Sequence, residues 1–224
     1  MGPENSAAAE LLGQGLEQLG IGLDEHACRR LLRYCEELQK WNRKINLIAR
    51  NTSLPDIIEK HFLDSLTLLP VLSEMAPGPG PLLDVGSGAG FPGLVVKIAH
   101  PARPVLLLEP RQRRSVFLRH IIRTLSLEGI EVSTARVEDD EPRPGFENFA
   151  VITGRAVADV ARFLEMVGPR AGPATIIACM QGPAGKQDWR QGSRAGNLRC
   201  LGWRETVLPF SGARRFILLF QTIQ

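Results

Sequence analysis

Two different hydrophobic patterns divide the chain. In its first part, apolar residues recur at the spacing of amphipathic helices. This pattern covers residues 6–19, 24–40 and 55–75. Asp24 is placed to cap the second helix, and Pro70 is placed to kink or end the third, because proline lacks the backbone N–H that a helix interior needs. We therefore expect the first part of the chain to be helical.

A proline- and glycine-rich stretch, APGPGP (76–81), marks a boundary because it cannot form regular structure. Beyond it, short apolar runs alternate with helical stretches, which predicts βαβ units and a mostly parallel sheet. The expected strands are 81–85, 104–109, 130–135, 149–154 and 174–180, and the expected helices are 90–100, 111–127 and 158–168. We expect an N-terminal helical appendage over residues 1–76 and a second domain over 77–224.

Two late apolar runs have no helix between them. They cover residues 204–209 and 214–221. We expect them to form an antiparallel pair that closes the sheet. The predicted fold is therefore a Rossmann-like α/β sheet of seven strands with helices on both faces, an antiparallel C-terminal end and the N-terminal helical appendage.

A glycine-rich loop follows the first expected strand and opens a helix. The sequence LLDVGSGAGFPG (82–93) holds four glycines in its last eight positions. Backbone N–H groups in such a loop can receive the polar part of a nucleotide-like ligand, and open parallel sheets bind ligands beyond the carboxyl ends of their strands. The acids and cations that fall at such strand ends are Asp84, Glu109, Glu138 and Arg155.

Two cofactors compete for this loop. Gly88, Gly90 and Gly93 satisfy the G-x-G-x-x-G pattern of dinucleotide-binding proteins, but the match does not directly follow the strand. The alternative, Asp84-x-Gly86-x-Gly88-x-Gly90, is typical of S-adenosylmethionine-dependent methyltransferases. That ligand carries an ammonium and a sulfonium, so an acid at the mouth of the loop suits it and would repel a pyrophosphate.

The second strand and the last two strands bear on this choice. Glu109 ends the second strand, and its carboxylate can accept both ribose hydroxyls of either cofactor. The antiparallel C-terminal pair favours the methyltransferase topology. We therefore expect S-adenosylmethionine as the cofactor.

Several segments together resemble one protein family. They are KWNRKINLI (40–48), KHFLDS (60–65), LLDVGSGAGFPG (82–93), RVED (136–139) and GRAVA (154–158). They resemble the glucose-inhibited division protein B family, bacterial methyltransferases that act on N7 of a guanine in 16S (small-subunit) ribosomal RNA. The resemblance runs from about residue 20 to the C-terminus, and the two segments upstream of the glycine loop make it specific.

The resemblance implies further cofactor contacts at Gly86, Phe91, Val137, Glu138 and Arg155. Phe91 would pack apolar surface beside the ligand, and Val137 with Glu138 would offer a backbone N–H and an acid near the adenine. Glu138 can also be a simple member of an acidic run, and Arg155 can form a surface salt bridge. The complete expected set is Asp84, Gly86, Gly88, Gly90, Phe91, Glu109, Val137, Glu138 and Arg155.

The chain departs from the family pattern on the expected substrate side. Gln181 ends the fifth strand where the family usually has lysine, Gly154 stands where serine is usual, and Ala150 stands where aspartate is usual. His61 and Asp64 are three positions apart on a helix and so share a face. They fit either a catalytic role or the packing of the appendage on the sheet.

Two more groups of residues invite an RNA-binding interpretation. Trp41, Asn42 and Asn46 fit either stacking on RNA bases or a turn packed against the sheet. The stretch over 111–123 holds five arginines and no acid. Its Arg111, Arg114 and Arg119 can face phosphates, or form the solvated side of a helix whose apolar side covers the sheet.

Charge is spread unevenly although the net charge is only +3. Residues 170–224 hold eight Lys or Arg against two acids. This asymmetry favours a cationic surface that faces a polyanion, with a solvated basic region as the alternative.

Location follows from what the sequence lacks. No apolar run approaches the roughly 20 residues that span a bilayer, and the first residues carry no basic cluster typical of a secretory signal. The four cysteines form no C-x-x-C pair, so we expect them to be reduced thiols of a cytoplasmic protein. They are Cys28, Cys35, Cys179 and Cys200. We expect no metal site.

The expected function is methylation of small-subunit ribosomal RNA, either naked or in the assembling subunit. Guanine N7 carries a free lone pair and no proton, so we expect no residue committed to general-base catalysis. Two alternatives remain: a non-catalytic RNA-binding module that retains the methyltransferase fold, and a methyltransferase that acts on another substrate.

Overall fold

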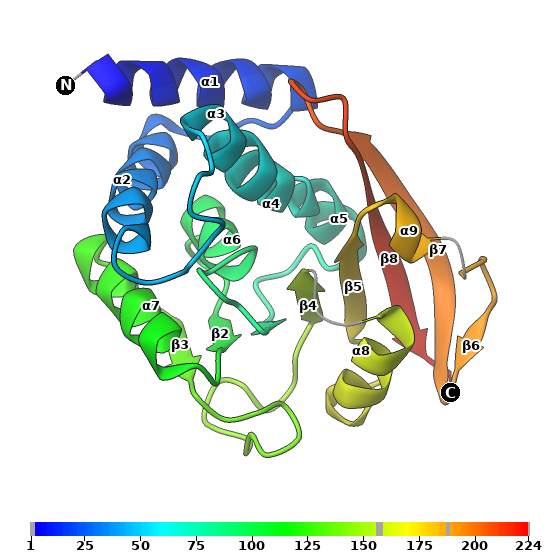
Figure 1. Cartoon of the computed structure of the whole chain (residues 1–224). Helices are drawn as coiled ribbons and strands as arrows, with labels where there is room; N and C mark the ends of the chain where they lie inside the picture. The colour runs from blue at the N-terminus through cyan, green and yellow to red at the C-terminus, as the bar shows by residue number, and fades with distance from the viewer. Residues whose placement is uncertain (1–2, 156–158, 187–188, 224) are drawn as a thin grey trace.

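Five parallel strands form one half of a single sheet (Figure 1). The computed structural model describes residues 3–155, 159–186 and 189–223. The parallel strands are β1 (Leu82–Val85), β2 (Val105–Leu108), β3 (Ile130–Ser133), β4 (Val151–Arg155) and β5 (Ile176–Gln181). The expected βαβ organisation is therefore confirmed.

Antiparallel strands complete the sheet. They are β6 (Arg194–Ala195), β7 (Leu198–Val207) and β8 (Arg214–Thr222). The order across the sheet is β3-β2-β1-β4-β5-β8-β7-β6, so β8 lies between β5 and β7 and runs antiparallel to both. The antiparallel C-terminal end is confirmed.

The predicted count of seven strands is wrong for the described residues, which form eight. The additional strand is β6, which pairs with β7 across the two-residue turn at Gly196 and Asn197. Gly196 has a φ of +57°, which such hairpin turns require. A strand of two residues has no hydrophobic alternation, so the sequence pattern could not reveal it.

Helices flank the sheet and connect its strands. Those before the sheet are α1 (Pro3–Leu19), α2 (Glu25–Asn42), α3 (Leu54–Ile57), α4 (Asp64–Leu66) and α5 (Leu68–Met75). The others are α6 (Gly93–Ala99), α7 (Gln112–Thr124), α8 (Val160–Val167) and α9 (Pro183–Lys186). Asp24 caps α2 as predicted, because its Oδ1 accepts the N–H of Ala27 at 2.7 Å. The expected start of α8 at residue 158 lies outside the described residues.

The third expected helix, 55–75, is interrupted rather than continuous. A π-helical segment, Ile58–Leu63, follows α3, and the chain turns at Thr67 between α4 and α5. The turn precedes Pro70 by three residues. Because Pro70 has no N–H to donate one helical turn back, the helix is interrupted at Thr67, and α5 resumes with Pro70 in its first turn. No helix of the described ranges is long and apolar enough to cross a membrane.

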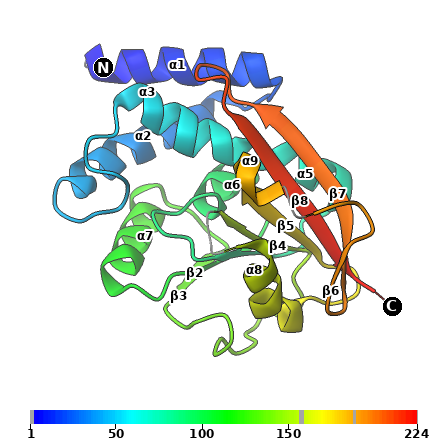
Figure 2. The same cartoon turned by 45° about the vertical axis from the view of Figure 1, so that its right-hand side comes forward.

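Both faces of the sheet are covered by apolar side chains. Leu82 and Leu83 of β1 belong to different hydrophobic clusters because successive strand residues point to opposite faces. The N-terminal helices pack with α6 and α7 on one face, and α8 packs on the other (Figure 2). One cluster thus contains both Leu63 and Leu82, across the boundary expected at residue 76. The division into residues 1–76 and 77–224 stays a prediction.

Arg103 fixes the segment that joins the helices to the sheet. It is buried, and its guanidinium donates hydrogen bonds of 2.6 Å to the carbonyl oxygens of Ala76, Gly78 and Gly80. These carbonyls belong to the proline-rich stretch, which has no ladder of its own. One side chain therefore replaces the missing secondary structure.

We expect Arg103→Met to lower the free energy of unfolding by about 1–3 kcal/mol, because three carbonyl oxygens lose a charged donor. Urea denaturation measures this loss. The control is Arg123→Met, which changes an exposed arginine of α7. Equal stabilities of the two variants would contradict this role for Arg103.

Candidate functional site

Asp84 supports the glycine loop from beneath. Its side chain is fully buried, and its Oδ2 accepts the N–H of Gly93 at 2.9 Å. A Cβ on Gly93 would lie 2.7 Å from that oxygen, so this approach requires glycine. Burial raises the pKa of the Asp84 carboxyl to about 7. Its Oδ1 has no hydrogen-bond partner among the described residues.

Tyr34 of α2 supports the same loop from the side. Its hydroxyl donates to the carbonyl oxygen of Ala89. Its ring stacks on Phe91, with centroids 5.4 Å apart and planes 17° apart. A Cβ on Gly90 would lie 2.6 Å from the Tyr34 hydroxyl and 2.3 Å from Cδ1 of Leu94. Close packing by a helix of the N-terminal part therefore accounts for Gly90.

Glu109 joins the loop to the end of β2. Its Oε2 accepts the N–H of Gly88 at 2.8 Å, and its Oε1 accepts the N–H of Arg111 at 2.9 Å. Each carboxylate oxygen has a second lone pair. The buried carboxylate is thus held rigidly while it retains the capacity to accept hydroxyl groups of a ligand.

These elements surround a cavity of about 630 Å³, which we call the glycine-loop cavity. It lies beyond the carboxyl ends of β1, β2 and β4, where open parallel sheets bind their ligands. Its wall consists of Leu47, Ile48, His61, Gly86, Ser87, Gly88, Ala89, Phe91, Glu109, Pro110, Arg111, Arg114, Arg136 and Arg155.

The cavity brings together five of the nine residues expected to contact a cofactor: Gly86, Gly88, Phe91, Glu109 and Arg155. The other four are not part of its wall. Asp84 lies under the loop, and Gly90 packs against Tyr34. Val137 is buried in the hydrophobic cluster on the α8 side, and Glu138 is exposed.

A turn after α2 contributes apolar wall residues that the sequence analysis did not identify. Asn42 Oδ1 accepts the N–H groups of Leu47 at 2.9 Å and Ile48 at 3.0 Å. The Trp41 ring packs against Phe117, with centroids 5.6 Å apart. These contacts support the interpretation of this motif as a packed turn. The only sequence feature that could have indicated this turn is Asn42, a residue type common in turns, placed a few residues before the apolar pair Leu47 and Ile48.

A second cavity, of about 390 Å³, adjoins the first, and we call it the neighbouring cavity. The two cavities share His61 and Arg155. Gln181, which departs from the family pattern, belongs to the wall of the neighbouring cavity. Among the described residues, its wall consists of Lys60, His61, Asp64, Arg155, Met180, Gln181, Gly182, Arg215, Phe216 and Ile217.

Arg155 occupies the partition between the cavities. Its guanidinium donates to the carbonyl oxygen of Lys60 at 2.8 Å and to Asp64 Oδ2 at 3.0 Å, and lies 3.1 Å from His61 Nδ1. It also lies over the Phe91 ring, 5.1 Å from its centroid. The side chain is only 16% exposed, so this ion pair is internal rather than a surface salt bridge.

The π-helical segment and α4 present two titratable groups to Arg155. Burial raises the pKa of the Asp64 carboxyl, although Arg155 and the Arg215 Nε, 3.1 Å from Asp64 Oδ1, oppose this shift. Burial, and then the charge of Arg155, lower the pKa of His61 to about 3. His61 is therefore neutral at pH 7, and its Nδ1 accepts a hydrogen bond from Arg155.

We expect His61 to make stability depend on pH. Its pKa is lower in the folded state, so the unfolded state binds more protons between about pH 3 and pH 6.5. Stability from this residue is complete above that range and falls as the pH falls. Relative to His61→Asn, the wild type should lose up to ~2 kcal/mol between pH 7.5 and pH 5 in urea denaturation. Parallel pH profiles would contradict this expectation.

Comparison with known proteins gives concordant matches. The family model described as rRNA small subunit methyltransferase G matches residues 27–214. The chain is 44% identical over 213 residues to the ribosomal RNA small subunit methyltransferase G of Desulfotalea psychrophila, which covers 94% of this chain and 96% of that protein. It is 33% identical over 211 residues to the protein of the same name from Syntrophotalea carbinolica, covering 92% and 94%.

Solved structures share the fold. A SAM-dependent methyltransferase from Aquifex aeolicus is 19% identical, covers 72% of this chain and 92% of that one, and gives a TM-score of 0.51. A mutant of MtNAS in complex with S-adenosylmethionine is 16% identical, covers 86% and 73%, and gives a TM-score of 0.57. The methyltransferase fold expected from the sequence is confirmed.

Proposed function

Because the chain belongs to the rRNA small subunit methyltransferase G family, we propose that it methylates N7 of a guanine in 16S ribosomal RNA, with S-adenosylmethionine as the methyl donor. The observation that carries this proposal is the pair of adjoining cavities that share His61 and Arg155. Direct group transfer requires donor and acceptor to be held in contact, and two contiguous cavities meet that requirement.

We assign the methyl donor to the glycine-loop cavity, which we therefore also call the donor cavity. Bound S-adenosylmethionine supplies an electrophilic methyl group on a sulfonium. Glu109 would hold the ribose, because its fixed carboxylate keeps lone pairs for two hydroxyls. Gly86 is exposed in the cavity wall with a φ of +71°, so its backbone leaves room for the ligand.

The buried acid beneath the loop fits a cationic ligand better than a pyrophosphate. Burial raises the pKa of the Asp84 carboxyl to about 7, and its Oδ1 accepts no hydrogen bond from the residues that the structure describes. A positive charge above the loop would favour the ionised form, whereas a pyrophosphate would oppose it. This argument favours S-adenosylmethionine over a dinucleotide.

We assign the guanine to the neighbouring cavity. Its wall carries three cations, Lys60, Arg155 and Arg215, against one acid, Asp64, and this positive balance suits an RNA ligand. Guanine N7 has a lone pair and no proton, so no side chain has to remove one. The neutral His61, whose Nδ1 already accepts a hydrogen bond, agrees with a positioning role there. The base would have to be unpaired or leave its stack to enter.

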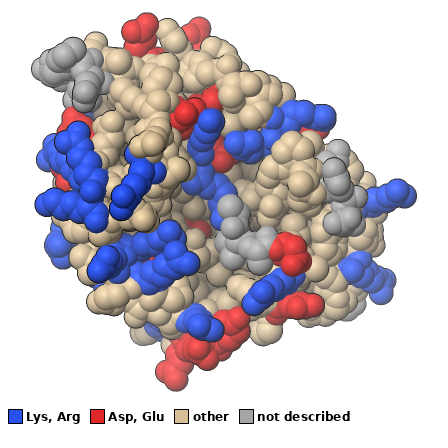
Figure 3. All heavy atoms as spheres, viewed as in Figure 1, with Lys and Arg blue, Asp and Glu red and all other residues tan. Residues whose placement is uncertain are grey.

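The phosphates of the RNA require a cationic surface near the cavity mouth. Several exposed cations have no carboxylate partner among the described residues. They lie just after α2, at the start of α7 and in the wall of the donor cavity. They are Arg43, Lys44, Arg111, Arg113 and Arg136. Lys and Arg side chains gather over this α2 and α7 side of the molecule (Figure 3). We propose that this side, which we call the α2–α7 face, contacts the RNA backbone.

The basic C-terminal part, residues 170–224, is partly neutralised. Among the described residues, four of its arginines pair with carboxylates, and three of those carboxylates come from earlier parts of the chain. These pairs are Arg170 with Asp140, Arg204 with Glu74, Arg214 with Glu205 and Arg215 with Asp64. The charge asymmetry of the sequence therefore does not translate into a continuous cationic surface there.

The test is methyl transfer from labelled S-adenosylmethionine to 16S ribosomal RNA, followed by mapping of the modified base. Naked RNA and small-subunit particles serve as separate substrates. We also propose that the protein acts in the cytoplasm, where both would be present. Label at guanine N7 supports the proposal. Cofactor binding without transfer to either substrate would favour a non-catalytic RNA-binding module, and transfer only to protein or small molecules would favour another substrate.

We expect Gly86→Asp to abolish cofactor binding while the protein stays folded. An aspartate would place a side chain and a negative charge in the exposed wall of the donor cavity, at a backbone conformation that disfavours non-glycine residues. Calorimetry with S-adenosylmethionine measures the affinity, and circular dichroism monitors folding. An unchanged affinity would refute the assignment of the donor cavity.

Charge reversal on the α2–α7 face should weaken RNA binding selectively. We expect Arg113→Glu to raise the KM for RNA about tenfold, to leave kcat unchanged, and to reduce the salt dependence of binding by about one phosphate contact. The matched control is Arg199→Glu, an exposed arginine of β7 with the same charge change. An equal effect of both variants would show that only net charge matters.

A further inference from the structure

A long irregular segment borders the donor cavity. Residues 134–150 connect β3 to β4 without helix or strand. Their internal backbone hydrogen bonds include Asp139 N–H to Arg136 C=O at 3.1 Å and Phe146 N–H to Arg143 C=O at 2.9 Å. The segment nevertheless brings Arg136 into the cavity wall. Side chains must therefore hold it in place.

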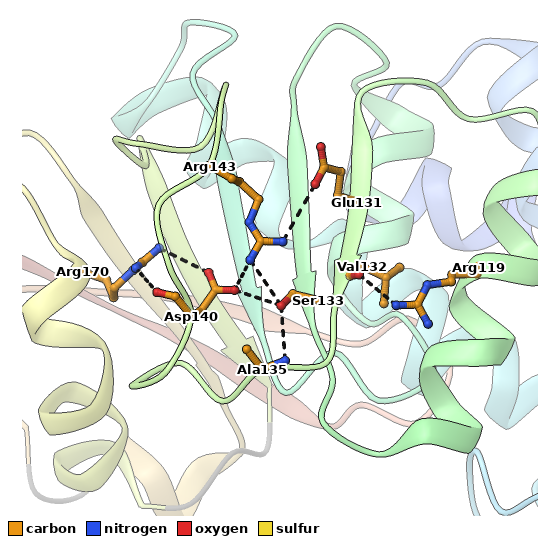
Figure 4. Close-up of polar contacts among 8 residues, drawn as sticks. All are labelled: Arg119, Glu131, Val132, Ser133, Ala135, Asp140, Arg143 and Arg170. Atoms are coloured by element: carbon orange, nitrogen blue, oxygen red, sulfur yellow. Dashed lines mark hydrogen bonds and ion pairs between the residues drawn. The ribbon is translucent and has the colours of Figure 1, made fainter.

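Asp140 is the centre of that anchoring (Figure 4). Its side chain is fully buried, with 0% exposure. Oδ1 accepts the hydroxyl of Ser133 at 2.9 Å and pairs with Arg143, while Oδ2 pairs with Arg170 at 3.4 Å. Arg170 also donates to the carbonyl oxygen of Asp140. The end of β3, the irregular segment itself and Arg170, which is 30 positions away in the sequence, thus converge on one carboxylate.

The cluster is one hydrogen bond away from the donor cavity. The carbonyl oxygen of Ser133 accepts the N–H of Glu109 at 3.0 Å. The hydroxyl of the same serine accepts the N–H of Ala135 at 3.3 Å. Arg136 lies between these anchored residues and Asp140. Asp140 is therefore connected to both Glu109 and Arg136, to the first through Ser133 and to the second through the segment itself.

The cluster depends on the negative charge of its carboxylate. Arg143 and Arg170 bring two positive charges to Asp140, and the only other acid that pairs with them among the described residues is Glu131, 3.9 Å from Arg143. The Arg143 Nε is buried without a partner there. Two guanidiniums left without the carboxylate would repel each other and draw in water, so the segment would move.

The position of the cluster indicates which end of the ligand it serves. Across the sheet, β3 and β2 lie on one side of β1, and β4 with Arg155 lies on the other. With the ribose at Glu109, the methyl group and the amino-acid end next to it have to face the neighbouring cavity, which begins at His61 and Arg155, so the base extends the opposite way, toward β3. Arg136 and the start of the irregular segment stand at the base end.

We propose that Asp140 is a positioning residue for the nucleoside end of the methyl donor. This inference rests on the proposed assignment of the glycine-loop cavity to S-adenosylmethionine. Asp140 touches no ligand. It holds the irregular segment and Ser133 so that Glu109 and Arg136 meet the ribose and the base in one fixed geometry.

The test variant is Asp140→Asn, which keeps the shape of the side chain and removes its charge. The matched control is Asp139→Asn, the exposed neighbour on the same segment. Calorimetry is performed with S-adenosylmethionine and with 5′-methylthioadenosine, which contains only the nucleoside end. We expect Asp140→Asn to weaken both ligands by about tenfold, because a charged hydrogen-bond network is lost, while Asp139→Asn leaves both affinities at wild-type values.

Kinetics supply a readout that general destabilisation would not reproduce. At saturating cofactor, Asp140→Asn should keep kcat and the KM for RNA within about twofold of wild type, while the KM for S-adenosylmethionine rises with the dissociation constant. Unchanged affinities, a loss in kcat alone, or weaker S-adenosylmethionine with unchanged methylthioadenosine would each overturn the proposal.

A milder variant covers the case in which Asp140→Asn does not fold. Ser133→Ala removes one hydroxyl and retains both ion pairs, so both ligands should weaken by about two- to fivefold with kcat preserved. Wild-type affinities in this variant would overturn the proposal. Failure of the proposed function has a different signature, since the wild-type protein would then bind no S-adenosylmethionine or transfer no methyl group to RNA.

Discussion

The glycine loop has to expose its backbone on one side while every polar group on its other side is satisfied. Asp84, Tyr34 and Glu109 meet this constraint from a strand, an N-terminal helix and the neighbouring strand end. Each accepts from or donates to a different part of the loop. The upper surface stays free because the lower surface is held by side chains that cannot move independently of the core.

Buried charges likewise hold distant parts of the chain together. Arg155, Asp64 and Arg215 join the end of β4, the helical segment before the sheet and the start of β8 into one buried ionic group between two cavities. Such a group contributes little net stability because desolvation offsets the attraction. Its value lies in geometry, since removing one member leaves the others unpaired and displaces the wall that the two cavities share.

Much of the fold was predictable because it follows from local periodicity. The alternation of strand and helix, the cap at Asp24 and the position of Glu109 after β2 are all encoded within a few residues. The interruption before Pro70 was visible only as a proline, because a π-helical segment has no distinct hydrophobic period. The strand β6 was too short to leave any pattern.

The site was predictable only in part, because three of its determinants are tertiary. The sequence places Asp84 at the mouth of the loop, but the pleat of β1 turns its side chain toward α6 and under the loop. Gly90 is required by Tyr34, a residue 56 positions away. The ion pair of Arg170 with Asp140 joins residues whose proximity only the folded sheet creates, so a count of charges could not foresee it.

The position of β8 has a consequence for the order in which the protein is made. This strand follows the other described strands in the sequence, so it leaves the ribosome after them, yet it lies inside the sheet between β5 and β7. Until it emerges, β5 presents an unpaired edge, and β7 has no neighbour on its inner side. A nascent chain that stops short of residue 214 therefore carries two unpaired strand edges, on β5 and on β7, which β8 pairs once it emerges.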